Sequence, residues 1–277
     1  APANSSPEPV TQNGVEDDVN ACIDGEIPLG EGHPAPAANC DDPISSTAAA
    51  IQQSFFAAAA AQLSLRAELL DPNVINVILC GTGTPVPSER TQACTAVFIG
   101  GKFLLFDAGD GASRSIERLQ LPLADLEALF LTHFHSDHID ALGELSVQRW
   151  AGGHQAKPLD VYGPPGVEQI VDGFNQAYAQ DTQYRIDHHG TKTVLPSGAG
   201  LLARPFAAIN NGERSLLLER DGLRITAFGV DHYPVPNAVG YRFDYKGRSV
   251  VISGDTRKSA NVQALAEDTD LLLHEAL

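Results

Sequence analysis

The segment Thr132–Asp140, with the sequence THFHSDHID, constrains the fold of this chain more than any other part of it. In an extended segment His133 and His135, two residues apart, project to the same side. Asp137 and His138 lie on the turn that follows. One loop can therefore offer two imidazoles to one cation, and a carboxylate with an imidazole to a second cation nearby.

The alternative interpretation of this segment is a polar turn on the surface. The apolar run Ala128–Leu131 directly before it disfavours that interpretation, because it predicts a buried strand leading into the motif. A single loop cannot complete two metal shells, so further donors are expected at the ends of other strands. Three candidates each follow a predicted strand: His232, Asp255 and His274.

The rest of the chain predicts an α/β fold. Apolar and β-branched runs predict strands at residues 74–80, 94–99, 102–106, 128–131, 159–162, 215–218, 224–230, 240–245, 249–253 and 271–274. Helix signals occur at 113–119 and from 167 to about 180. Strands in succession with helices among them predict two sheets with helices outside them.

Three regions are expected along the chain. Residues 1–43 are acidic and rich in Pro and Gly, and predict an irregular N-terminal extension. Residues 44–72 predict a helix, whose apolar stripe is expected to pack on the outside of the main domain. That stripe consists of Ile51, Phe55, Ala59 and Leu63. Residues 73–277 form the main domain.

The charge balance bears on the partners. The chain has 35 acidic and 18 basic side chains, a formal net charge of -17, and no run of Lys or Arg. Such a field would repel a nucleic acid, so no nucleic acid is expected as a partner. The Ala-rich stretch Ala48–Leu65 is interrupted by Gln and Ser, and falls short of the roughly 20 apolar residues of a membrane span. We therefore expect a soluble protein without a membrane span.

The four cysteines and the N-terminal residues bear on location. Cys22 and Cys40 lie in a Gly/Pro/Asp-rich segment without a neighbouring metal-type cluster, and predict a disulfide. Cys80 and Cys94 lie in two predicted strands and either pair across them or stay as buried thiols. Pro/Ser/Asn-rich residues at the start are typical of the segment after a removed export signal. A periplasmic or secreted protein is therefore expected.

The order of the motifs resembles that of a known family. The series is GTGTPVPSERTQA, FDAGDGA, THFHSDHIDAL, VYGPPG, HYPVPNAVGYR, ISGDTR and LLLHEA, and it covers about residues 77–277. It is similar to the metallo-β-lactamase superfamily, and within it to the tRNase Z-like branch, which also contains secreted arylsulfatase-type hydrolases and cyclic phosphodiesterases. The resemblance implies the four-layer αββα sandwich of the metallo-β-lactamase fold, with its C-terminal part missing.

The resemblance also implies a site with two zinc ions, for which Mn or Fe could substitute. One ion would be bound by His133, His135 and His232, and the other by Asp137 and His138. Asp255 would bridge the two ions. In the same family pattern Asp107 supports the ligand loop from behind, His274 donates a proton to the leaving group, and the adjacent Glu275 could orient it.

One zinc-binding His of the branch has no counterpart here, because this sequence stops at Leu277. Three explanations are open: a truncated chain, a His274 that has moved into the metal shell, or an incomplete second site. Truncation is the favoured one, since an uncovered strand is an unusual terminus.

The expected chemistry is that of a binuclear metal-dependent hydrolase acting on ester bonds. A metal-bridging hydroxide, oriented by Asp137, would attack a small anionic ester, either an aryl sulfate or a phosphodiester. The alternatives are a lactone or β-lactam hydrolase, a tRNA 3′ endonuclease, and a non-catalytic module that binds metal or a partner protein. The segment 240–255 has no insertion for the protruding arm of tRNA-processing relatives, which disfavours the endonuclease. The oligomeric state is left open, a homo-oligomer included.

Overall fold

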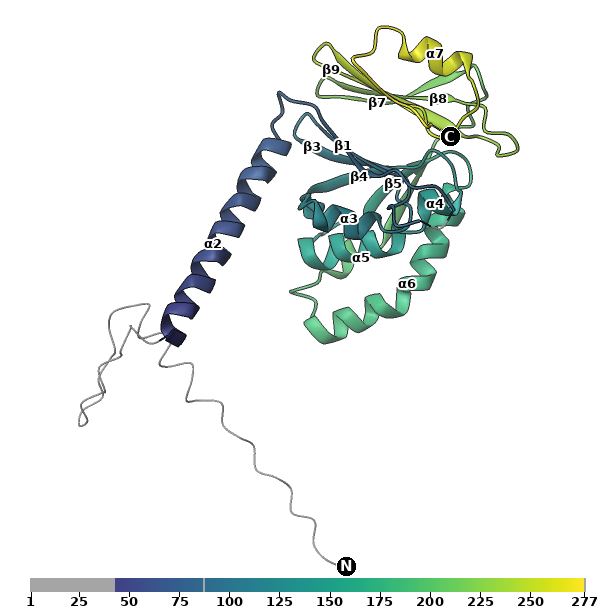
Figure 1. Cartoon of the computed structure of the whole chain (residues 1–277). Coiled ribbons are helices and arrows are strands. Elements are labelled where there is room, and N and C mark those ends of the chain that lie inside the picture. Colours follow the sequence, from purple (N-terminus) through teal and green to yellow (C-terminus); the bar gives the residue numbers. More distant parts are fainter. Residues whose placement is uncertain (1–42, 87, 277) are drawn as a thin grey trace, which may run out of the picture. The chain divides into compact units, whose positions relative to one another are not determined.

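The computed structural model describes residues 43–86 and 88–276, and the chain divides into two compact units, residues 1–65 and 66–277 (Figure 1). In the first unit, residues 43–65 form most of helix α2, Pro43–Leu69, where the sequence predicts a helix. The predicted disulfide between Cys22 and Cys40 lies outside the described residues. None of the described helices is long and apolar enough to cross a membrane.

Two β-sheets form the second unit. The first sheet has the strand order β1-β2-β3-β4-β5-β6. Its strands are β1 Asn76–Gly81, β2 Cys94–Ile99, β3 Lys102–Phe106, β4 Leu126–Phe130, β5 Leu159–Gly163 and β6 Leu201–Pro205. The second sheet has the order β11-β10-β9-β8-β7. Its strands are β7 Arg214–Arg220, β8 Leu223–Gly229, β9 Val239–Tyr245, β10 Arg248–Ile252 and β11 Leu271–Leu273.

Helices cover the outer faces of both sheets. Three helices lie on the first sheet, and α7 lies on the second (Figure 1). The described helices of this unit are α3 Ala112–Arg118, α4 Ser136–Ile139, α5 Leu142–Gly153, α6 Val167–His189 and α7 Ala260–Ala266; those on the first sheet are α3, α5 and α6. The layers are therefore helix, sheet, sheet and helix, which confirms the predicted αββα sandwich.

An aromatic core lies between the sheets. Phe106 of β3 stacks on Phe130 of β4 with ring centroids 5.0 Å apart, and contacts Phe243 of β9 at 4.9 Å. Tyr241 of β9 packs against Phe130 and donates its hydroxyl hydrogen to the carbonyl of Leu131 at 2.6 Å. Burial of each large side chain stabilises the fold by about 1.5–3 kcal/mol. These contacts fix β4 against β9, and so fix the loops that leave the strand ends.

The structure contains several elements beyond the predicted ones, helices α4 and α7 among them. Strand β6 was not predicted, because Leu201–Pro205 contains an arginine and a proline and has little β-propensity. It forms because its backbone pairs in parallel with β5. Helix α6 continues to His189, beyond the predicted end near residue 180. Its last turns are polar, so no apolar stripe marks them.

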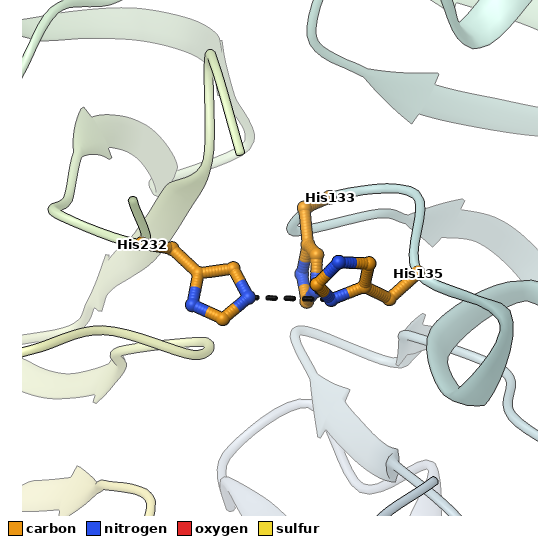
Figure 2. Close-up of side chains that lie close together, drawn as sticks. All are labelled: His133, His135 and His232. Carbon is orange, nitrogen blue, oxygen red and sulfur yellow. Dashed lines mark hydrogen bonds between the residues drawn. The ribbon is translucent and has the colours of Figure 1, made fainter. Parts of the chain in front are cut away.

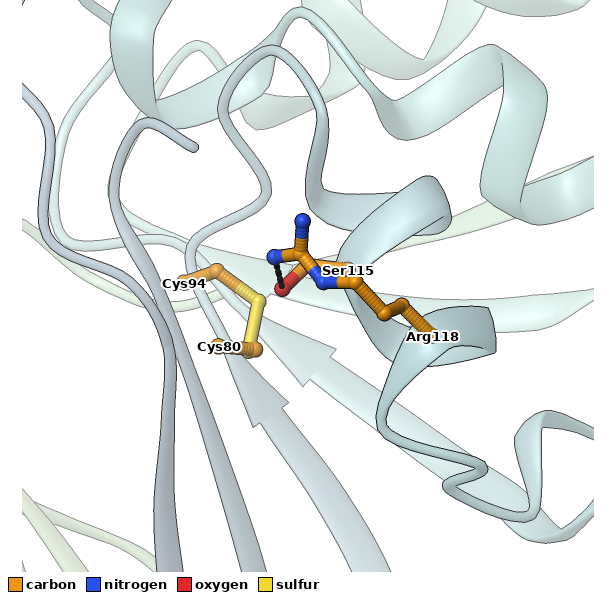
Figure 3. Close-up of a disulfide and its surroundings, with 4 residues drawn as sticks. All are labelled: Cys80, Cys94, Ser115 and Arg118. Atoms are coloured by element: carbon orange, nitrogen blue, oxygen red, sulfur yellow. Dashed lines mark hydrogen bonds between the residues drawn. A yellow bond between two sulfur atoms is a disulfide. The ribbon is translucent and has the colours of Figure 1, made fainter. Parts of the chain in front are cut away.

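Cys80 and Cys94 form a disulfide between β1 and β2 (Figure 3). Both residues are buried, and they lie beside α3, whose Ser115 accepts a hydrogen bond from Arg118. Of the two alternatives that the sequence leaves open for this pair, the structure contains the cross-strand bond. Disulfides persist in oxidising compartments, but a location outside the cytoplasm stays a prediction.

We expect replacement of both Cys80 and Cys94 by serine to lower the free energy of unfolding by about 3 kcal/mol, the value for a closed loop of about 15 residues. The two cysteines are 14 positions apart. Urea unfolding can be followed through the fluorescence of Trp150, the single tryptophan of the chain. Wild-type protein in a reducing buffer should unfold like the double variant, and equal midpoints for the oxidised wild type and the variant would contradict the prediction.

Candidate metal centre

Five strands end at the same place and present polar side chains there. The residues are Asp107 after β3, His133 after β4, His232 after β8, Asp255 after β10 and His274 after β11. Strands β3 and β4 run parallel in one sheet, and β10 and β11 run parallel in the other. Their carboxyl ends therefore lie at a common edge, where the sequence places its candidate ligands.

Three imidazoles form the first group of donors (Figure 2). His135 Nδ1 lies 3.0 Å from His133 Nε2 and 3.3 Å from His232 Nε2. His133 is buried, His232 is half-buried and His135 is exposed. The loop of the first sheet carries two of the rings and a loop of the second sheet carries the third, and the rings point toward one another (Figure 2).

This spacing suits a single metal ion. In a tetrahedral zinc site with Zn–N bonds of about 2.0–2.1 Å, neighbouring ligand nitrogens are about 3.3 Å apart. The two nitrogen separations of 3.0 and 3.3 Å are close to that value. Neutral imidazole is also the form that binds zinc. The donor set and its spacing therefore fit a zinc ion held by His133, His135 and His232.

The second group of donors consists of His133, His138 and Asp255, and Asp137 lies next to His138. His138 Nε2 is 3.5 Å from Asp255 Oδ1 and 3.6 Å from Asp137 Oδ2. Asp255 Oδ2 is 3.9 Å from His232 Nε2, so the two oxygens of this carboxylate face both groups. A second ion between His138 and Asp255 would have an imidazole and two carboxylates around it, which are also ligands that zinc accepts.

Asp107 holds the ligand loop in place. Its carboxylate accepts hydrogen bonds from the backbone N–H and the hydroxyl of Thr132, each at 2.8 Å, and its Oδ2 lies 2.8 Å from His138 Nδ1. The Nε2 atom of His138 is thereby directed at the carboxylates of Asp137 and Asp255. The φ angle of Asp107 is 56°, a left-handed conformation that Asp tolerates better than most residues. Thr132 was not predicted, and only its place next to His133 could have suggested it.

A close approach between two backbones completes this support. A Cβ atom at Gly109 would lie 1.9 Å from the carbonyl oxygen of Asp137. The backbone N–H of Ala108, next to it, donates to the carbonyl of His138 at 2.8 Å. The glycine of the FDAG segment therefore lets the segment pack directly on the ligand loop.

The two central histidines have opposite pKa shifts. Burial, the neighbouring His138 and the other imidazoles lower the pKa of His133 to about 2, although Asp255 opposes them. Burial also lowers the pKa of His138, but the carboxylates of Asp107 and Asp255 outweigh it and raise the pKa to about 10. Burial raises the pKa of Asp255, and His138 and the other imidazoles outweigh it, so that the pKa is lowered. The side chains thus favour a carboxylate at Asp255 and a neutral ring at His133.

His274 follows strand β11 at the same strand ends. It lines a cavity of about 580 Å³ together with Asp137, His138 and Asp255. Its Nδ1 atom is 2.8 Å from Ser253 Oγ, and it belongs to neither group of metal donors among the described residues. Proton donation by His274 stays a prediction.

The prediction that Glu275 orients His274 requires correction. Glu275 Oε1 accepts a hydrogen bond from the backbone N–H of Thr256 at 2.5 Å, next to Asp255. The partner of the imidazole is Ser253, which lies directly across the parallel pair β10 and β11. Glu275 thus supports the turn that carries Asp255, and the sequence could not distinguish these two neighbours.

We expect Asp107→Asn to lower the affinity for zinc by about 10- to 100-fold, because an amide holds the His138 ring less firmly than a carboxylate. Competition with a chromophoric chelator measures this affinity. The matched control is Asp110→Asn, a neighbouring carboxylate whose partner is Arg114 at 3.5 Å. If the Asp107 variant binds zinc like the control, the supporting role of Asp107 is wrong.

A four-layer sandwich with His and Asp side chains gathered at its strand ends defines a class of metal-binding proteins. Residues 88–272 match the sequence profile of the metallo-beta-lactamase superfamily, and the chain belongs to this family. Members of the superfamily, ribonuclease Z included, are metal-dependent hydrolases that act on phosphodiester or ester bonds.

Several proteins similar to this chain are ribonucleases Z. The chain is 34% identical over 207 residues to the ribonuclease Z of Mycobacterium marinum, covering 74% of this chain and 71% of the relative. It is 35% identical over 207 residues to that of Mycobacterium avium, with the same coverage. In structure it is similar to the short form of human tRNase Z, with a TM-score of 0.57, 24% identity, and coverage of 73% of this chain and 78% of the human one.

These relatives contradict the prediction that nucleic acid is excluded as a partner. The prediction used the net charge of the whole chain, which is a poor guide to the field at one site. Nine of the 35 acidic residues and none of the 18 basic residues lie in residues 1–65, whereas the candidate site belongs to the unit of residues 66–277. The sequence count also omits bound cations, which would be the largest local charges in the cavity.

Proposed function

We propose that this chain is a metal-dependent phosphodiesterase that cleaves RNA, with tRNA as the substrate class. One observation supports the proposal most strongly. Two adjoining groups of His and Asp donors lie at the strand ends, and the chain that contains them is 34% identical to a ribonuclease Z. A scaffold alone would not decide between the chemistries that this fold supports. The substrate class therefore rests on the relatives, and the reaction type rests on the side chains.

Each residue of the site is given a separate role in this proposal. Zinc ions, when bound, supply Lewis acidity and lower the pKa of water. His133, His135 and His232 would hold one ion, and His138, Asp137 and Asp255 the other. The Asp137 carboxylate, buried in the cavity wall, would also orient the attacking water and accept its proton. His274 would donate a proton to the departing oxygen of the phosphodiester.

Two observations shape the choice of substrate. The relatives named ribonuclease Z lend no support to an aryl sulfate as the substrate. Strands β9 and β10 are joined by a turn at Lys246 and Gly247, so the segment between them holds no protruding arm. An RNA substrate would then be held mainly at the cavity and its rim, where the phosphate that is cleaved has to lie.

The experiment is a substrate panel with zinc-loaded protein. It should contain a precursor tRNA with a 3′ extension, bis(p-nitrophenyl) phosphate, p-nitrophenyl sulfate and a lactone. Cleavage of the precursor and of the phosphodiester, lost on chelation and restored by zinc, is the expected result. Turnover of the lactone or the sulfate alone would overturn the proposal, and zinc binding without turnover of any substrate would favour a non-catalytic module.

A further inference from the structure

The loops that carry His232 and Asp255 are joined by hydrogen bonds between neighbouring residues. The backbone N–H of Arg257 donates to the carbonyl of Asp231 at 2.8 Å. The backbone N–H of Asp231 lies 3.2 Å from Thr256 Oγ1. Residues just outside the two ligands are therefore held together across the end of the second sheet. The side chains of these residues therefore leave the backbone within two positions of the candidate ligands His232 and Asp255.

An aromatic ring and a guanidinium meet next to these two ligands in the chain. Tyr233 follows His232 directly, and 72% of its surface is exposed. Its backbone N–H donates to Asp231 Oδ1 at 3.3 Å, and this bond holds the backbone from which the side chain extends. The Cζ atom of Arg257 lies over the ring, 5.3 Å from its centroid, a cation–π arrangement. Because Arg257 lies over one face, the high exposure of the ring leaves the other face open.

Packing does not account for this pair. A tyrosine that serves the core is buried, as Tyr241 is, whereas Tyr233 is among the most exposed large side chains of the described residues. Arg257 has no carboxylate within 4.0 Å in residues 43–86 and 88–276, although the chain is strongly acidic. A ring with a cation on one face and solvent on the other is the kind of surface on which nucleobases stack.

We propose that Tyr233, backed by Arg257, is the stacking platform for the base of the nucleotide next to the phosphodiester that is cleaved. The proposal rests on the proposed function and adds a specificity-determining residue to it. Stacking of this kind tolerates any base, because every base has a π face. The site would thus prefer nucleotide esters to simple phosphodiesters, without reading the sequence of the RNA at this position.

The test compares two phosphodiesters with the same leaving group. One is the p-nitrophenyl ester of thymidine 5′-monophosphate and the other is methyl p-nitrophenyl phosphate, which has no base. The ratio of their kcat/KM values isolates the nucleoside, since a loss of folded or metal-loaded protein lowers both values equally. We expect Tyr233→Ala to lower this ratio by about tenfold, a typical effect of removing one stacking side chain.

Two variants complete the series. Tyr233→Phe keeps the ring and should keep the ratio. Tyr184→Ala removes a tyrosine on α6 that is 60% exposed, and should not change the ratio either. An unchanged ratio in Tyr233→Ala, or an equal loss in Tyr233→Phe, would overturn the proposal.

Binding separates this proposal from the proposed function. If the wild type hydrolyses neither ester, the proposed function fails, but the platform can still be tested by calorimetry with adenosine 5′-monophosphate. The Kd of the zinc-loaded protein should then rise by about tenfold in Tyr233→Ala and stay the same in Tyr233→Phe. A Kd that is equal in the wild type and the alanine variant would overturn the platform.

Discussion

Replacing Asp255 with asparagine is expected to lower kcat/KM for phosphodiester cleavage by about a thousandfold or more. Its two oxygens lie 3.5 Å from His138 Nε2 and 3.9 Å from His232 Nε2, so this one carboxylate faces both groups of donors. An amide offers one oxygen and no negative charge. A metal-dependent site supplies several kcal/mol of transition-state stabilisation, and each 1.36 kcal/mol corresponds to a factor of ten in rate.

Metal analysis should accompany the rate measurement. The bound zinc per chain is expected to fall in the Asp255 variant, because the second group has few donors besides His138 and Asp137. Asp172→Asn, which changes an exposed carboxylate on α6, is the matched control and should keep both activity and metal. Full activity and full zinc content in the Asp255 variant would show that this residue does not bridge the two groups.

The second large effect is expected from His274→Ala, and it depends on the leaving group. Cleavage of RNA releases an alkoxide, which needs a proton, and loss of the proton donor typically costs about 10²- to 10⁴-fold in rate. Nitrophenolate departs readily without a proton. The same variant should therefore retain most of its activity on bis(p-nitrophenyl) phosphate.

The comparison of the two substrates distinguishes this role from a structural one. If His274 only held the sheet edge through Ser253, or acted as a metal ligand, both substrates would lose activity to a similar extent. His189→Ala, at the exposed end of α6, serves as the control for removing a surface histidine. Equal losses on RNA and on the nitrophenyl ester would rule out proton donation by His274.

The candidate metal centre could be predicted from the sequence because its residues obey local rules. The spacing of His133 and His135 fixes their common direction in an extended segment, and the strand before them fixes where the loop starts. His232 and Asp255 could be proposed because each follows a clear apolar strand. The sequence could not predict the distances between these side chains. In the structure the imidazole nitrogens of His135 and His232, which come from different sheets, are 3.3 Å apart.

Other features depend on contacts between segments that are far apart in the sequence. The partner of His274 is Ser253 rather than its neighbour Glu275, because the parallel pairing of β10 with β11 places Ser253 beside it. The choice between a disulfide and two thiols at Cys80 and Cys94 depends on the register of β1 against β2. The prediction about nucleic acid failed for a different reason, since a sum of charges over the whole chain has no information about one cavity.

The central claim is that the side chains at the strand ends hold two metal ions side by side. An anomalous difference map at the zinc absorption edge, from a crystal of the zinc-loaded protein, tests it most directly. We expect two peaks, one among His133, His135 and His232, and one between His138 and Asp255. A map with no peak at these residues, or with zinc bound only elsewhere on the protein, would contradict the account.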